Sequence, residues 1–143
     1  MFYEDLKDLA ETKLRESKAL LDAGFPDGAY YLAGYVIELA LKARICKILQ
    51  WDTYPHQDIK EINKEFKTHK LYQLILLAGL SKDLENKKLN DKFSENWSLI
   101  ADWNESMRYK KSTGKTRDEE VKNTIFAIED SQNGIFTWLK NTW

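Results

Sequence analysis

The chain has 143 residues, of which 43% are apolar and 31% charged, and its formal net charge is −1. This length suits one domain, and the apolar and aromatic content is too high for a disordered tail. The near-neutral charge excludes a uniformly basic nucleic-acid-binding surface, although a local basic patch remains open. We therefore expect residues 1–143 to form a single domain.

The first predicted helix covers residues 3–23. Leucines recur along it at helical spacing, so that one face is apolar while the other is charged. Gly24 and Pro26 interrupt this pattern, and proline is tolerated in the first turn of a helix. A second helix is therefore expected to begin at about Asp27.

The second predicted helix, residues 27–49, is apolar on all sides in its first half. Such a helix must be covered on more than one face, and a small helical domain rarely covers one helix so completely by itself. We therefore expect a homodimer in which a second subunit covers the second helix in the region of Tyr31, Tyr35 and Glu38.

The remaining elements follow from the same spacing. They are a loop with one weak helical turn over 51–67, a helix over 69–80 capped by Thr68, a polar segment over 81–88, a helix over about 89–107, a break at 109–115, and a last helix from a capping-box pattern at Thr116 to Leu139. Strand-type alternation is missing. The sequence predicts an all-α fold, an up-and-down bundle of four to five helices.

Several familiar kinds of site are missing from the sequence. It has no glycine-rich phosphate loop, and two histidines with one cysteine make a metal site improbable, so we expect neither metal nor cofactor. Cys46 cannot form an internal disulfide, and the first residues do not resemble a signal peptide. The longest near-apolar run, Ala29–Leu41, is shorter than the roughly 20 residues of a membrane span. A cytoplasmic protein without a membrane partner is expected.

Glu38 and Lys42 are the most informative charged residues. They lie four positions apart in the order that favours pairing on one helical face, within an apolar stretch. An unpaired charge there would be costly, so Glu38 should pair with Lys42, Arg44 or a distant arginine. A structural ion pair is the favoured interpretation, and contact with a ligand is the alternative.

A basic segment follows the fourth predicted helix. Five cations within ten residues, with Tyr109 among them, are able to hold phosphate and stack on a base. The predicted phosphate-binding residues are Arg108, Tyr109, Lys110 and Lys111. The alternative is a solvated loop, because acidic residues follow directly. His69 is expected to support the start of the helix after it, and a catalytic role is less favoured.

Three pieces of sequence together resemble the HEPN family, named for higher-eukaryote and prokaryote nucleotide-binding domains. They are Gly28–Ala43, with its Glu-x-x-x-Lys-Ala signature, Thr68–Leu71 and Met107–Tyr109. The resemblance implies a helical bundle that commonly dimerises. It also implies roles in RNA cleavage, nucleotide binding, or toxin–antitoxin and defence systems, with a nucleotidyltransferase-type protein as a partner. By this resemblance Glu38, Lys42, His69, Arg108 and Tyr109 occupy the positions of the family's motifs.

One departure from the family pattern bears on catalysis. Ribonuclease members carry an arginine and a histidine with four to six residues between them. Neither His56 nor His69 has an arginine at that distance, and no histidine follows Arg108. A non-catalytic dimeric domain that binds a nucleotide, RNA or a protein partner is therefore the leading hypothesis. The alternatives are a metal-independent ribonuclease toxin with an altered catalytic set, and a purely structural interaction module.

Overall fold

The computed structural model describes residues 1–57, 63–106 and 115–143, and over these ranges it is all-α, as predicted. The described helices are α1 (Tyr3–Asp22), α2 (Pro26–Leu49), α3 (Asn63–Phe66), α4 (Leu71–Leu77), α5 (Ser81–Lys87), α6 (Asp91–Ser98), α7 (Lys115–Glu129) and α8 (Ile135–Lys140). In the described part of the chain, no helix combines the length and the apolar character needed to cross a membrane.

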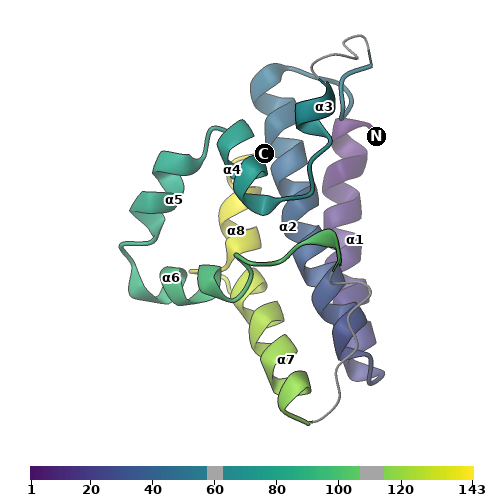
Figure 1. Cartoon of the computed structure of the whole chain (residues 1–143), viewed down its shortest axis with the longest axis vertical. Coiled ribbons are helices and arrows are strands. Elements are labelled where there is room, and N and C mark those ends of the chain that lie inside the picture. The colour runs from purple at the N-terminus through teal and green to yellow at the C-terminus, as the bar shows by residue number, and fades with distance from the viewer. Residues whose placement is uncertain (58–62, 107–114) are drawn as a thin grey trace.

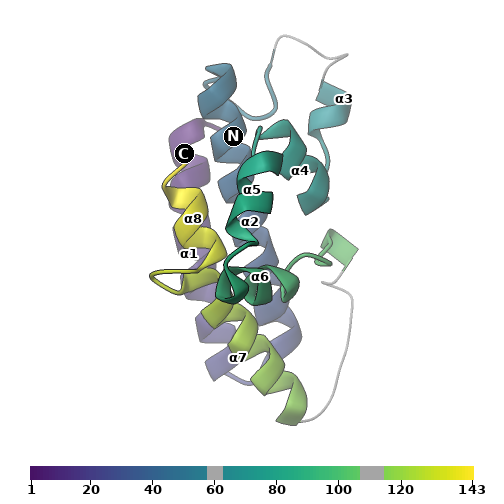
Figure 2. The same ribbon diagram turned by 90° about the vertical axis from the view of Figure 1, so that its left-hand side faces the viewer.

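Helices α1 and α2 form a long hairpin, in which α1 lies along one edge of the molecule and α2 runs beside it (Figures 1 and 2). Its turn depends on Gly24, whose φ of +89° is readily adopted by glycine alone, and the Phe25 amide donates to the Leu20 carbonyl at 2.8 Å. Inside the hairpin, Ser17 Oγ donates to the Ala29 carbonyl at 2.6 Å. Helices α7 and α8 pack along α2, while α4, α5 and α6 form an arm at its side.

Helix α2 is buried along most of its length, and the cover comes from its own chain. It contacts α1, α4, α7 and α8, and Trp103, from the segment after α6, packs over Gly34. A Cβ atom at Gly34 would lie 2.2 Å from the Trp103 ring, so this close approach requires glycine. Much of the apolar surface of α2 is thus covered within the chain, whereas Tyr31 and Tyr35 remain half-buried, and dimerisation stays a prediction.

The arm differs from the expected pair of longer helices. Helix α5 forms within a segment that was expected to be merely polar, and Trp138 Nε1 holds it to α8 by donating to Asp83 Oδ2 at 2.7 Å. Helix α6 begins where the Asn90 side chain accepts from the Phe93 amide at 3.1 Å. It ends at Ser98 rather than near 107, because the chain turns there and carries Trp103 onto α2.

The last predicted helix is divided into α7 and α8. Asp130 makes the break, since its Oδ2 accepts from the Asn133 amide at 2.8 Å, and a Cβ at Gly134 would lie 2.4 Å from the Asp130 carbonyl oxygen. The described part of α7 starts at Lys115, so the start that the capping-box pattern predicts at Thr116 is already helical there. The turn that Asp130 forms therefore ends α7, although the apolar spacing continues beyond it.

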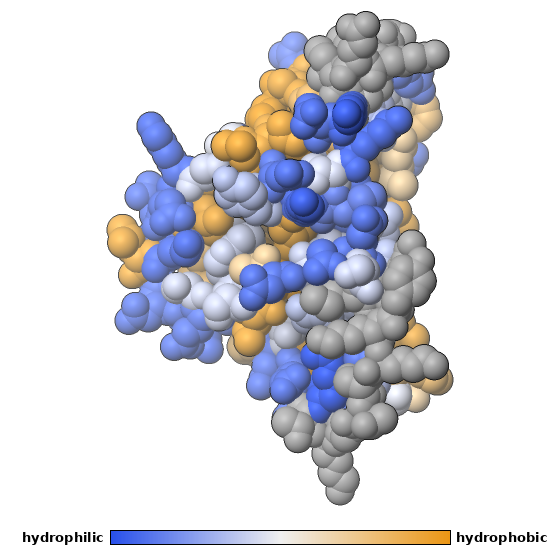
Figure 3. Space-filling view, viewed as in Figure 1, coloured by the Kyte–Doolittle hydropathy of each residue, from blue (hydrophilic) through white to orange (hydrophobic). Residues whose placement is uncertain are grey.

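The face shown in Figure 3 is mainly hydrophilic, with small groups of apolar residues between the charged ones. Several large apolar side chains of the described chain are exposed, among them Tyr72 and Leu76, four positions apart on α4, and Leu89. Single exposed apolar residues are normal for a folded protein and identify no site by themselves.

Candidate functional site

Glu38 is the most deeply buried acidic residue of the site described below. Its side chain, on α2, is 1% exposed, and Lys42 Nζ donates to its Oε1 at 2.6 Å. Burying a carboxylate costs free energy unless it is paired and hydrogen-bonded. The structure thus joins Glu38 and Lys42 in the arrangement that their spacing predicts.

His69 reaches the same carboxylate from the segment between α3 and α4. Its Nδ1 lies 2.7 Å from Glu38 Oε1, and its Nε2 lies 3.3 Å from Glu105 Oε2. His69 does not cap α4, because Lys70 is the N-cap of that helix and no side-chain hydrogen bond caps it. Thr68 was also expected to be that cap; its Oγ1 instead accepts from the Lys70 amide at 3.1 Å.

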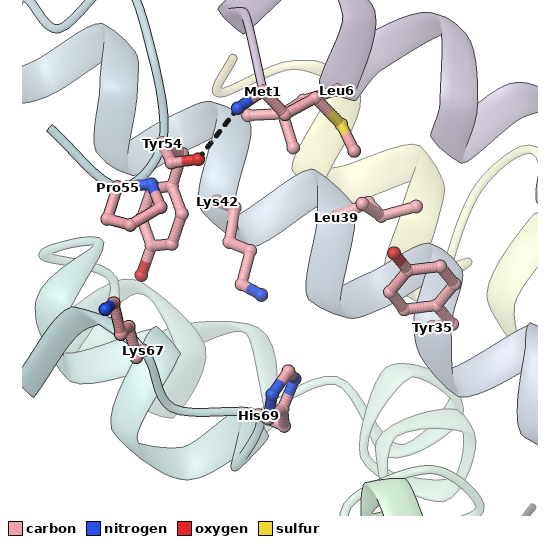
Figure 4. Close-up of a pocket in the computed structure, with 9 residues that line it drawn as sticks. All are labelled: Met1, Leu6, Tyr35, Leu39, Lys42, Tyr54, Pro55, Lys67 and His69. Carbon is pink, nitrogen blue, oxygen red and sulfur yellow. Dashed lines mark hydrogen bonds between the residues drawn. The ribbon is translucent and has the colours of Figure 1, made fainter. Parts of the chain in front are cut away.

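Lys42 and His69 line a cavity of about 330 Å³. Figure 4 shows the Lys42 ammonium extending between Tyr54 and Tyr35 toward the His69 ring. Cationic, aromatic and aliphatic side chains share the cavity wall: Met1, Leu6, Tyr35, Leu39, Lys42, Tyr54, Pro55, Lys67 and His69. Such a cavity has an apolar lining with a few convergent polar groups, which is typical of a small-ligand site.

Tyr54 is held firmly at the cavity. Its amide donates to the Met1 carbonyl at 2.8 Å, and its hydroxyl donates to the Phe66 carbonyl. Lys42 Nζ lies 5.4 Å from the centre of its ring, a cation–π distance. Burial, with smaller effects from neighbouring acidic groups, raises the pKa of Tyr54 well above its usual range. The phenol therefore stays protonated and keeps its hydrogen bond at any ordinary pH.

Tyr35 contributes a second phenol to the cavity. Burial and then the nearby Glu38 carboxylate raise the pKa of Tyr35. Its ring stacks on Tyr31, with centroids 6.2 Å apart, and Tyr31 in turn lies 5.8 Å from Trp103. Of the three α2 residues expected at a dimer interface, Tyr31 and Tyr35 are half-buried, whereas Glu38 is covered by its own chain.

The predicted phosphate-binding residues Arg108, Tyr109, Lys110 and Lys111 lie outside the described residues. Trp103, a few residues before them in the chain, is buried and belongs to the core. Over the described ranges, no group of three or more histidine, cysteine or acidic residues is arranged to hold a metal ion.

Comparison with known proteins identifies the family. The HEPN domain family matches residues 3–133, which is most of the chain and includes Glu38, Lys42 and His69. The chain belongs to the HEPN domain family. The Large T antigen of squirrel monkey polyomavirus is 32% identical over 127 residues, covering 82% of this chain and 18% of the viral protein. No solved structure gives a significant match.

For this HEPN domain, the sequence did not point to three residues of the site: Tyr54, Lys67 and Glu105. Tyr54 follows the end of α2, and Lys67 follows α3, so neither lies in a periodic pattern. In the sequence, Glu105 does not differ from an ordinary exposed acidic residue of a loop, and only the fold brings it to His69. Nothing in their spacing signals the site, because three separate segments form it.

Proposed function

We propose that this HEPN domain binds a nucleotide in the cavity beside Glu38, holds its phosphate through Lys42, Lys67 and His69, and does not cleave it. The observation that carries the proposal is that three nitrogen-bearing side chains from two separate segments line one cavity. Family membership makes a nucleotide-related role plausible.

The charges around the cavity favour an anionic ligand. Lys42 and Lys67 are cationic, and Glu38 offsets one of these charges from beneath the wall. The negative charge of Glu105 opposes the binding of an anion. Its side chain is 54% exposed, however, so water screens this charge.

The shape of the cavity suits the rest of a nucleotide. Its volume of about 330 Å³ lies at the lower end of the range of small-molecule sites. The Tyr35 ring and the side chains of Leu6 and Leu39 form the apolar part of the wall, against which a base is able to pack.

Anisotropy titration with a fluorescent ATP analogue tests this proposal. Lys67→Glu should weaken binding about tenfold, because a charge-assisted hydrogen bond is replaced by repulsion. Lys67 is exposed, so the fold should survive the change. Lys82→Glu on α5 alters the net charge equally at another exposed position and should bind like the wild type. Absent wild-type binding, or equal affinity of Lys67→Glu, would overturn the proposal.

One observation favours a second candidate function, metal-independent cleavage of RNA. The 2.7 Å contact from Glu38 Oε1 to His69 Nδ1 orients the ring, so that Nε2, which lies 3.3 Å from the exposed Glu105 carboxylate, is the ring nitrogen for proton transfer. In this scheme Nε2 takes the proton of a 2′-hydroxyl, and its oxygen attacks the phosphorus. The bond to the 5′ oxygen breaks, and that oxygen takes a proton from the Lys42 ammonium.

Cleavage is tested with end-labelled RNA and excess protein in EDTA. The enzyme hypothesis expects products with 2′,3′-cyclic phosphate ends that disappear in His69→Ala and persist in Lys82→Glu. Intact RNA under these conditions would reject it and favour the non-catalytic proposal.

We also propose that the domain forms a homodimer. Independently of this, we propose that it associates with a nucleotidyltransferase-type protein in a toxin–antitoxin or defence system. Half-buried Tyr31 and Tyr35 are the part of the expected α2 surface that a partner could reach. Light scattering at micromolar concentration should give a dimer mass that falls in Tyr31→Glu. A monomer at these concentrations would contradict the homodimer.

A further inference from the structure

Four aromatic rings gather beside the cavity, just beyond the end of α2. Trp51 is at the centre of the cluster, with its centroid 4.8 Å from Phe66, 5.2 Å from His56 and 6.4 Å from Tyr54. Tyr54 is buried, whereas Trp51, His56 and Phe66 each remain partly exposed. The buried ring anchors the cluster, and the other three present aromatic surface to solvent.

This ring cluster, defined as Trp51, Tyr54, His56 and Phe66, is continuous with the cavity. Tyr54 belongs to both, and its hydroxyl is fastened to the Phe66 carbonyl. Lys67, the residue after Phe66, lines the cavity as well. A ligand that extends out of the cavity past Tyr54 and Lys67 therefore meets the exposed rings next.

The segment that carries Phe66 is mainly positive. From α3 to the start of α4 it has three exposed lysines, Lys64, Lys67 and Lys70, against one described acid, Glu65. Two further acidic residues lie nearby, exposed Asp52 directly after Trp51 and Glu105 beside His69. Exposed rings interspersed with lysines are the combination that binds single-stranded nucleic acid, because bases stack on the rings while lysines contact phosphates. An apolar peptide would gain little from these lysines.

We propose that the ring cluster is a base-stacking surface that extends the cavity, so that the ligand is a single-stranded polynucleotide rather than a free nucleotide. One nucleotide occupies the cavity, and the adjoining base lies on the exposed surface of Trp51, His56 and Phe66. Lys64 contacts the phosphate beyond it. This inference rests on the proposed function of the cavity and names the class of its ligand.

The experiment compares two probes on the same variants: a labelled 12-nucleotide single-stranded RNA and the fluorescent ATP analogue. Trp51→Leu keeps apolar volume but removes the stacking surface, and it should weaken RNA binding about tenfold. Lys64→Glu should weaken RNA binding and lower the slope of log affinity against log salt by about 1. Both variants should bind the ATP analogue within twofold of the wild type.

Controls separate this inference from the proposed function. Lys82→Glu should leave RNA binding unchanged, and circular dichroism should show native helicity in Trp51→Leu. RNA affinity that is unchanged in both Trp51→Leu and Lys64→Glu, while the ATP analogue binds, overturns the stacking surface alone. Equal competition by a duplex of the same sequence also overturns it, because paired bases cannot stack on the rings. Failure of the wild type to bind the ATP analogue overturns the cavity proposal itself.

Discussion

The imidazole of His69 and the carboxylate of Glu38 are 31 positions apart in the chain, yet Nδ1 and Oε1 lie 2.7 Å apart. Lys42 Nζ contacts the same oxygen at 2.6 Å. One buried carboxylate oxygen thus joins the middle of α2 to the segment before α4. Glu38 therefore serves the fold and also positions two of the three nitrogens at the cavity.

Replacing Glu38 should be costly for stability. Glu38→Gln removes the negative charge between Lys42 and His69, and breaking a buried ion pair costs about 3 kcal/mol in the free energy of unfolding. The matched control is Glu85→Gln, whose ion pair with Lys88 is largely exposed and should contribute less than about 0.5 kcal/mol. Urea unfolding measures both variants. Similar losses would show that Glu38 is not the buried link described above.

Gly34→Ala tests the contact between α2 and Trp103. The new Cβ would lie 2.2 Å from the ring, so overpacking should destabilise the fold by about 2 kcal/mol. Gly28→Ala in the same helix meets Leu20 Cδ1 at 3.4 Å and should change stability by less than about 1 kcal/mol.

A double-mutant cycle with Trp103→Ala completes that test. If the ring causes the loss, Gly34→Ala should cost much less in the Trp103→Ala background than in the wild type. Additive losses in thermal unfolding would mean that the clash lies elsewhere.

The thiol of Cys46 should be unreactive in the folded protein. Burial raises the pKa of Cys46 to about 11, from an ordinary value of 9.0, so the thiolate is scarce at neutral pH. Ellman's reagent at pH 8 should modify the chain only after urea unfolds it. Rapid reaction under native conditions would contradict the buried position.

The same pKa difference predicts a pH dependence. The folded state holds the thiol proton more tightly than the unfolded state, so this contribution to stability is full below pH 9 and is lost as the pH rises toward 11. Cys46→Ala should therefore flatten part of the decline in the free energy of unfolding over that window. An unchanged slope would argue against the raised pKa.

The hydrogen bond from Trp138 to Asp83 should hold α5 against α8. Asp83→Ala leaves the indole N–H without its 2.7 Å acceptor and should cost about 1 kcal/mol. Trp138→Phe removes the donor from the same pair, and the double variant should be less destabilised than the sum of the two. Purely additive losses would indicate that the two side chains act independently.

The candidate site shows which contacts sequence patterns predict and which they do not. The pairing of Glu38 with Lys42 is local, because four residues of helix always bring two side chains to one face. The contacts of His69 with Glu38 and Glu105 depend on where three separate segments meet, and spacing along the chain contains no such distance. For the same reason, the sequence predicts a contact of His69 with the start of the next helix and not its contact with Glu38.

The amino-acid sequence by itself determined the helical class, the α1–α2 hairpin and membership of the HEPN family, because periodic apolar residues and turn-forming glycine and proline act over a few positions. Tertiary structure decided how α2 is covered, where α6 ends and which groups line the cavity. Each of these depends on packing between distant segments, as when Trp103 settles on Gly34. Together with α1, α4, α7 and α8, this contact covers much of the apolar surface that the pattern alone left without a neighbour.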